Sequence, residues 1–210
     1  AASHPNWAAV QVDLAIAVLN RQAEGDEQAA LRRLEGVLAA HPDNLRARYT
    51  SGLLRLNAGD IEQAREDFHS VALADPSDAY AAYYLGQSMM QLGEIEPSLR
   101  HFEQAIKLDP YLRSAYYAGS QAARRAGQAG RSAAWLDVFQ RMEHNPRGHL
   151  AEIKYTRMGP KAELVAIAPM KRDAAPRPIG PIFYVEALSI RDCDHCPSVL
   201  SLSAGWTGQG

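Results

Sequence analysis

The chain has 210 residues, of which 47% are hydrophobic and 22% are charged, and its formal net charge is -2. This composition is typical of a globular protein, and the near-neutral charge gives no electrostatic support for sequence-independent binding of nucleic acid. No apolar run reaches the roughly 18 to 20 residues that a transmembrane helix needs. Two cysteines cannot form a framework for so long a chain, so the fold must be stable through packing.

A pattern of small residues, an aromatic residue and a proline recurs along the chain with a period of 34 residues. In residues 45–78 it consists of Gly52, Gly59, Ala64, Phe68 and Pro76. One period later stand Gly86, Gly93, Ser98, Phe102 and Pro110, and one period earlier stand Val18, Gly25, Ala30, Leu34 and Pro42. A fixed period of this length predicts stacked helix–turn–helix units, each of which buries its apolar face against the next.

Four such repeats are predicted after an N-terminal arm at 1–10. Their ranges are 11–44, 45–78, 79–112 and 113–148. In the second repeat, Gly59 allows the positive φ that ends a helix, and Asp60 is expected to cap the helix that follows. Gly52 is small so that two helices can approach closely, and Phe68 is expected to fill the space between neighbouring repeats.

The period is lost after residue 148. Residues 150–158 predict a short helix that caps the array, so that 149–181 would consist of a capping helix and a Pro-rich linker. Residues 182–210 predict a short β segment, because 182–190 are rich in β-branched and aromatic residues and 198–203 alternate polar with apolar. Two strands cannot bury a core, so they would dock on the repeats, pair with another chain or begin a second domain.

The first helix of each repeat is expected to line the concave surface of the solenoid. Tyr and Gln dominate this predicted groove, and Tyr is enriched where proteins bind other proteins. The alternative is that Tyr84, Tyr116 and Tyr83 pack between helices as core. The predicted groove residues are Arg46, Tyr49, Asn57, Tyr80, Tyr83, Gln87, Gln91, Tyr117, Gln121 and Arg124.

Chemistry-bearing motifs are few. Cys193, His195 and Cys196 lie within four residues, and the pattern is compatible with a local disulfide between the cysteines, a metal site or a redox pair. The sequence contains no nucleophile elbow, no zinc-protease motif and no phosphate-binding glycine loop. We therefore expect no enzyme activity and no cofactor.

The four repeats resemble the tetratricopeptide family over residues 11–148, which implies an all-α solenoid that binds a protein or peptide. Tetratricopeptide domains that grip chaperone tails share a clamp of Lys and Asn. This chain lacks that clamp and has other residues at the same positions, namely Tyr49, Leu53, Tyr84, Ser114 and Ala118.

A narrower resemblance rests on LDPYLRSAYYAGSQAARRAGQAGRSAAWLDVFQRME and on KYTRMGP at 154–160. These segments look like the repeats that precede an FG-GAP/VCBS-type β-propeller with an ASPIC/UnbV end in bacterial exported proteins. The resemblance implies a periplasmic or extracellular location, with a cytoplasmic one as the alternative, and implies that 182–210 begin the propeller. The calcium-binding DxDGxxD motif of such propellers does not occur in these residues.

Two functions follow as hypotheses. The first is a non-enzymatic interaction module that holds a peptide or protein segment in the concave groove. The second is a structural subunit of a homo-oligomer or filament that assembles through strands in 182–210.

Overall fold

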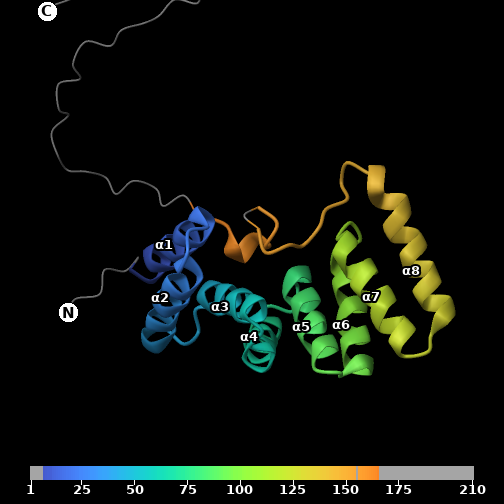
Figure 1. Ribbon diagram of the computed structural model, residues 1–210, viewed down its shortest axis with the longest axis horizontal. Helices are drawn as coiled ribbons and strands as arrows, with labels where there is room; N and C mark the ends of the chain where they lie inside the picture. Colours follow the sequence, from blue (N-terminus) through green and yellow to red (C-terminus); the bar gives the residue numbers. More distant parts are fainter. Residues whose placement is uncertain (1–6, 155, 166–210) are drawn as a thin grey trace, which may run out of the picture. The chain divides into compact units, whose positions relative to one another are not determined.

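The computed structural model describes residues 7–154 and 156–165, which lie in one compact unit (Figure 1). These residues form an all-α repeat fold, as predicted. The predicted β segment at 182–210, most of the Pro-rich linker and the Cys193–Cys196 motif lie outside the described residues. The α-helices are α1 (Trp7–Arg21), α2 (Asp26–Ala40), α3 (Leu45–Ala58), α4 (Ile61–Ala74), α5 (Ala79–Gln91), α6 (Ile95–Leu108), α7 (Arg113–Arg125) and α8 (Ala129–Arg141).

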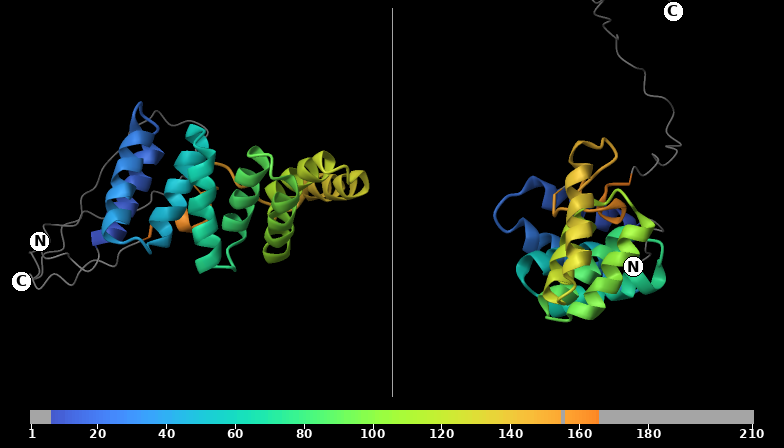
Figure 2. Two further views of the ribbon diagram at one scale, coloured as in Figure 1. Left: turned by 90° about the horizontal axis from the view of Figure 1, so that it is seen from below. Right: turned by 90° about the vertical axis from the view of Figure 1, so that its right-hand side faces the viewer.

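The helices stack in chain order. Each odd-numbered helix packs against the even-numbered helix that follows it, and that helix packs against the first helix of the next repeat (Figure 2, left). Two short 3₁₀ helices, η1 (Met142–His144) and η2 (Pro160–Ala162), follow α8. No helix among the described residues is long and apolar enough to cross a membrane.

Glycines and caps set the helix ends. Gly59 has a φ of 86° and donates its N–H to the Arg55 carbonyl, which ends α3 in the predicted way. The side chains of Asn44 and Asp78 accept from Ala47 and Ala81 and cap α3 and α5. The prediction for Asp60 is wrong in part, because it occupies the N-cap of α4 without a side-chain hydrogen bond. Its ψ of 69° is smaller than the 98° and 104° of Asn44 and Asp78, which have the extended backbone that such caps require.

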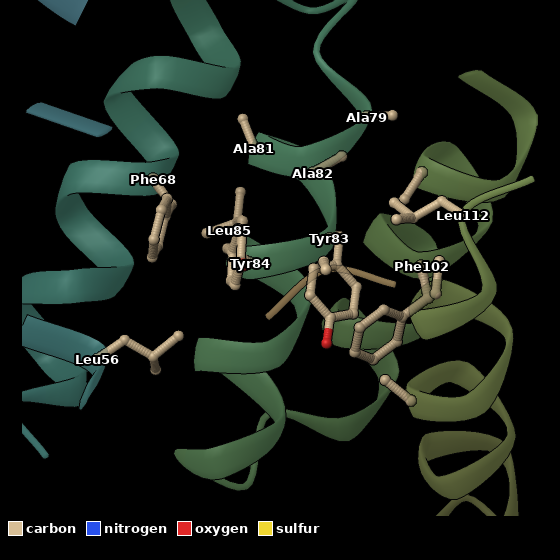
Figure 3. Packing of buried hydrophobic residues seen from close by; sticks show 14 of the residues in the cluster. Leu56, Phe68, Ala79, Ala81, Ala82, Tyr83, Tyr84, Leu85, Phe102 and Leu112 are labelled. Carbon is tan, nitrogen blue, oxygen red and sulfur yellow. The ribbon is translucent and has the colours of Figure 1, made fainter. Parts of the chain in front are cut away.

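The repeat pattern corresponds to a packing rule. A Cβ added to Gly52 would lie 3.0 Å from Cζ of Phe68, and one added to Gly86 would lie 3.0 Å from Cε1 of Phe102. The small residue of the first helix therefore makes room for the phenylalanine of the second. Phe68 in turn stacks on Tyr84 of the next repeat, with ring centroids 5.3 Å apart (Figure 3). This confirms that Phe68 packs between neighbouring repeats.

The capping helix predicted for 150–158 is absent, because the described part of that range contains turns and extended chain but no helix. The segment does not cover the end of the array either. It returns from α8 toward α1, as the orange part of Figure 1 shows. On the way it contacts α7, α5, α3 and α1. We call residues 149–154 and 156–165 the strap.

Candidate functional site

The strap lies on the surface formed by the first helices α1, α3, α5 and α7, which we call the inner surface. The strap divides the ten predicted groove residues into two sets. Arg46, Tyr49 and Tyr80 contact the strap directly, and Tyr83 lines a pocket together with strap residues Ala151–Ile153. The other six lie outside its direct hydrogen bonds and are Asn57, Gln87, Gln91, Tyr117, Gln121 and Arg124.

The strap begins with backbone hydrogen bonds at the start of α7. His149 donates its N–H to the Tyr111 carbonyl and accepts from the Arg113 N–H, which makes an isolated parallel bridge between Leu112 and His149. Ser114 then accepts from the Ala151 N–H at 2.9 Å. Because these bonds use backbone groups of the strap, they fix its path without needing particular strap side chains.

The side chain of His149 joins the strap to both ends of the third repeat. Its Nε2 lies 2.9 Å from Oδ2 of Asp109, and its ring stacks on Tyr80 of α5 with centroids 6.0 Å apart. The sequence showed no partner for this histidine, because Asp109 and Tyr80 are distant in the chain.

The strap passes closest to α3 and α5 at Met158 and Gly159. The hydroxyl of Tyr49 donates a hydrogen bond to the Met158 carbonyl, and both residues are fully or almost fully buried. A Cβ on Gly159 would lie 2.6 Å from the Tyr49 hydroxyl and 2.9 Å from Cγ of Tyr80. Gly159 also has φ 99° and ψ 160°, a conformation essentially limited to glycine. Only glycine fits between the two tyrosines.

Two residues later, Lys161 is held by a pair of carboxylates. Its Nζ lies 2.5 Å from Asp75 and 2.6 Å from Asp78, on the turn that joins α4 to α5. Burial alone would lower the pKa of Lys161, but the hydrogen bonds to both aspartates outweigh it and raise the pKa above its ordinary value. The hydrogen bond from Lys161 in turn lowers the pKa of Asp75. The ion pair therefore remains charged across neutral pH.

Arg46 of α3 holds the end of the strap. Its guanidinium donates to the carbonyls of Lys161 at 3.3 Å and Glu163 at 2.5 Å, and it forms an ion pair with Asp13 of α1 at 2.7 Å. Ala162, between the two carbonyls, is fully buried in the main hydrophobic cluster.

The tyrosines of the predicted groove are therefore less available than the repeat pattern suggested. Tyr49 is fully buried and Tyr83 is 7% exposed, so neither is an open contact point for a partner. Tyr84 and Tyr116 are buried, as the alternative interpretation expected. Burial raises the pKa of Tyr83 to about 12. Tyr117 differs, because it is 48% exposed and packs on Phe139 of α8.

Two open pockets adjoin the strap. One, of about 240 Å³, is lined by Gln87 and Gln91 of α5 together with Ala151–Ile153 of the strap. The other, of about 440 Å³, lies between the turn that joins α1 to α2 and strap residues that include Lys154. Asn57 and Ile153 line both pockets, so the pockets are neighbours. The structure thus brings Asn57, Gln87 and Gln91 together at one open site.

Tyr83 also lines the smaller pocket, whereas Tyr117, Gln121 and Arg124 are not among the residues that line either of these two pockets. Gln121 accepts a 2.5 Å hydrogen bond from Arg124 within α7, and the Arg124 side chain is exposed. Within the described ranges, no group of three His, Cys, Asp or Glu side chains is placed to hold a metal ion.

Sequence reasoning missed the strap residues and the aspartates that hold Lys161. One local signal was available, since Gly159-Pro160 is a pair typical of turns and not of a continuing helix. Nothing local pointed to the docking position on α3 and α5, because the partners are more than 80 positions away.

Comparison with known proteins agrees with this architecture. Family models described as tetratricopeptide repeat match residues 21–82 and 79–112. MamA 41-end from Desulfovibrio magneticus RS-1 is similar with 23% identity and a TM-score of 0.61, over 68% of this chain and 78% of that one. A crystal structure of MamA is similar with 22% identity and a TM-score of 0.55, over 57% and 70%.

At these identities the structural matches show the fold alone. A search of curated proteins gave no significant match. The narrower likeness to propeller-bearing exported proteins, and the location it implies, stay predictions.

Proposed function

Because residues 21–112 are tetratricopeptide repeats, we propose that this protein is a non-enzymatic module that binds an extended segment of a partner protein at the open part of its inner surface. Repeat proteins of this class use such surfaces to bind other proteins. The observation that supports this site is the pair of adjoining pockets that share Asn57 and Ile153.

The chemistry of the pocket walls suits a peptide backbone. Asn and Gln side chains each carry an acceptor and two donors, so Gln87 and Gln91 can bind both the N–H and the C=O of an extended chain. They are one helical turn apart on α5, which places both amides on one face of the helix. Apolar contact would come from Ile153 and Leu56, which also line the smaller pocket.

The strap shows that a chain segment outside the α-helices fits the neighbouring part of the surface. Arg46, Tyr49 and Ser114 already bind strap carbonyl or N–H groups. A partner segment in the open pockets would lie alongside the strap and contact Glu152–Lys154.

The test uses the full chain and a displayed library of random peptides. Peptides selected on the native chain should bind the Gln87→Ala/Gln91→Ala variant about tenfold or more weakly, since each lost hydrogen bond costs about 1 kcal/mol. Alanine is a good helix former, so the variant should fold. Gln140→Ala, an exposed position on α8, is the matched control and should bind like the native chain. Peptides that bind the double variant as well as the native chain would exclude this site.

The variant pair Tyr83→Ala and Tyr117→Ala is a poor test. Tyr83 is part of the main buried cluster, so its loss would destabilise the array and confuse binding with unfolding.

A further inference from the structure

The strap residues 158–163 contact the first helices in the way that a bound peptide contacts its receptor. Three carbonyls, those of Met158, Lys161 and Glu163, accept hydrogen bonds from side chains of α3. Any chain that forms the same 3₁₀ turn as η2 could supply these carbonyls. The selectivity of the site must therefore come from the strap side chains.

Three strap positions are chemically selective. The position of Gly159 excludes every side chain, because a Cβ would collide with Tyr49 and Tyr80. The position of Lys161 faces two carboxylates, with the lysine 17% exposed and Asp78 7% exposed. The position of Ala162 is fully enclosed. Together they describe a short motif of glycine, any residue, a basic residue and a small residue.

We propose that residues 158–163 are an internal ligand of a peptide site on α3 and α5, and that this site takes a partner segment of the same chemistry when the strap is displaced. The partner segment forms the same short 3₁₀ turn as η2, with a glycine between the two tyrosine rings and a lysine two residues later. The proposal rests on the proposed function only in treating the inner surface as a peptide-binding surface, since Gln87 and Gln91 contribute nothing to it.

The internal ligand has a large advantage over a free peptide. A segment tethered to its own site acts at an effective concentration on the order of millimolar, so a weak external copy does not compete in the native chain. Loss of the lysine from the strap should reduce this advantage, because the paired carboxylates then lack a cation while the rest of the site remains.

The probe is a labelled peptide with the sequence of residues 156–165, TRMGPKAELV, tested on full-length chains. It should bind the Lys161→Ala chain about tenfold more tightly than the native chain. Lys107→Ala, which removes an exposed lysine near the end of α6, is the control and should bind like the native chain. A peptide with alanine in place of the lysine, or valine in place of the glycine, should bind the Lys161→Ala chain no more tightly than it binds the native chain. Addition of Asp75→Asn to the Lys161→Ala chain should likewise abolish the tighter binding of the native peptide sequence.

A second measurement keeps the proposal testable if Lys161→Ala does not fold. In the native chain, peptide supplied above the millimolar effective concentration of the tethered strap should accelerate hydrogen exchange at the Val165 amide, which is bonded to Asp13. Equal binding of the peptide by native and Lys161→Ala chains, together with unchanged strap exchange, would overturn the proposal.

Self-association of the native chain that the peptide reverses would also overturn it, because the occupant would then be the strap of a second copy. Failure of the library selection at Gln87 and Gln91 would leave this test untouched, since the two experiments use different residues and different peptides.

Discussion

The hydroxyl of Tyr49 on α3 donates a hydrogen bond to the carbonyl of Met158, a residue 109 positions later in the chain. Both side chains are buried at this contact. The bond fixes the strap to the second repeat and covers part of the surface that the repeat pattern assigned to a partner. Several measurable consequences depend on this arrangement.

Gly159→Ala should destabilise the protein by about 3 kcal/mol, since it combines a glycine-only conformation with a Cβ in collision with Tyr49 and Tyr80. If the strap detaches instead, the loss is limited to its docking free energy and the strap amides exchange faster. Denaturant unfolding and hydrogen exchange measure the two effects. Gly130→Ala is the control, because a Cβ there meets nothing and alanine favours the helix. Equal stability of the two variants would contradict the tight fit at Gly159.

Gly52→Leu should cost about 2 to 4 kcal/mol of unfolding free energy, because the side chain would overlap the ring of Phe68 and separate α3 from α4. The same substitution at Gly36 is the control, because nothing lies within 4 Å of a Cβ at that helical position. Comparison of the denaturation midpoints of the two variants tests the packing rule. A similar loss at both positions would mean that helix propensity, and not the approach to Phe68, determines the cost.

Lys161→Met should lower the unfolding free energy by about 1 kcal/mol, because it leaves Asp75 and the poorly exposed Asp78 without their cation. Lys154→Met should change stability little. The change in this stability contribution at acid pH has a defined sign. Because the pKa of Asp75 is lowered in the folded chain, its contribution is present above the ordinary carboxyl pKa and is lost as pH falls through the lowered value.

At Lys161 the dependence of stability on pH has the opposite direction, because the pKa of Lys161 is raised in the folded chain. Its contribution is complete below the ordinary lysine pKa and disappears as pH rises through the raised value. Unfolding curves of the native chain and Lys161→Met should therefore converge at both extremes of pH. A constant difference across the whole range would contradict the ion pair.

Alkaline pH should destabilise the array through Tyr83. Its pKa is raised to about 12 by burial, so the unfolded chain loses the phenolic proton first as pH passes the ordinary value near 10. Between about pH 10 and 12 this residue should remove about 1.4 kcal/mol of stability for each pH unit. Tyr83→Phe should show a shallower decline in denaturant unfolding over that range. An identical slope in both chains would mean that Tyr83 ionises without opening the core.

The sequence predicted the surroundings of some residues of the candidate site better than those of others. Asn57, Gln87 and Gln91 were placed on the inner surface from repeat register alone, and they line the open pockets. Tyr49 and Tyr83 were placed on the same face, but the register could not reveal that the strap and the neighbouring helices bury them. The position of a residue in the repeat fixes the direction of its side chain. The exposure of that side chain depends on which other segments pack against the same face.

The sequence by itself determined the repeats. The 34-residue period, the glycines at the turns and the pairing of Gly52 with Phe68 are local or nearest-neighbour features, and a solenoid is stabilised mainly by such contacts. Only the tertiary structure decided the path of residues 149–165 within its described part. The strap is held by backbone carbonyls and by partners such as Asp75 and Asp13, which are far away in the chain. Backbone groups are the same at every residue, so their choice of partner leaves no pattern in the sequence.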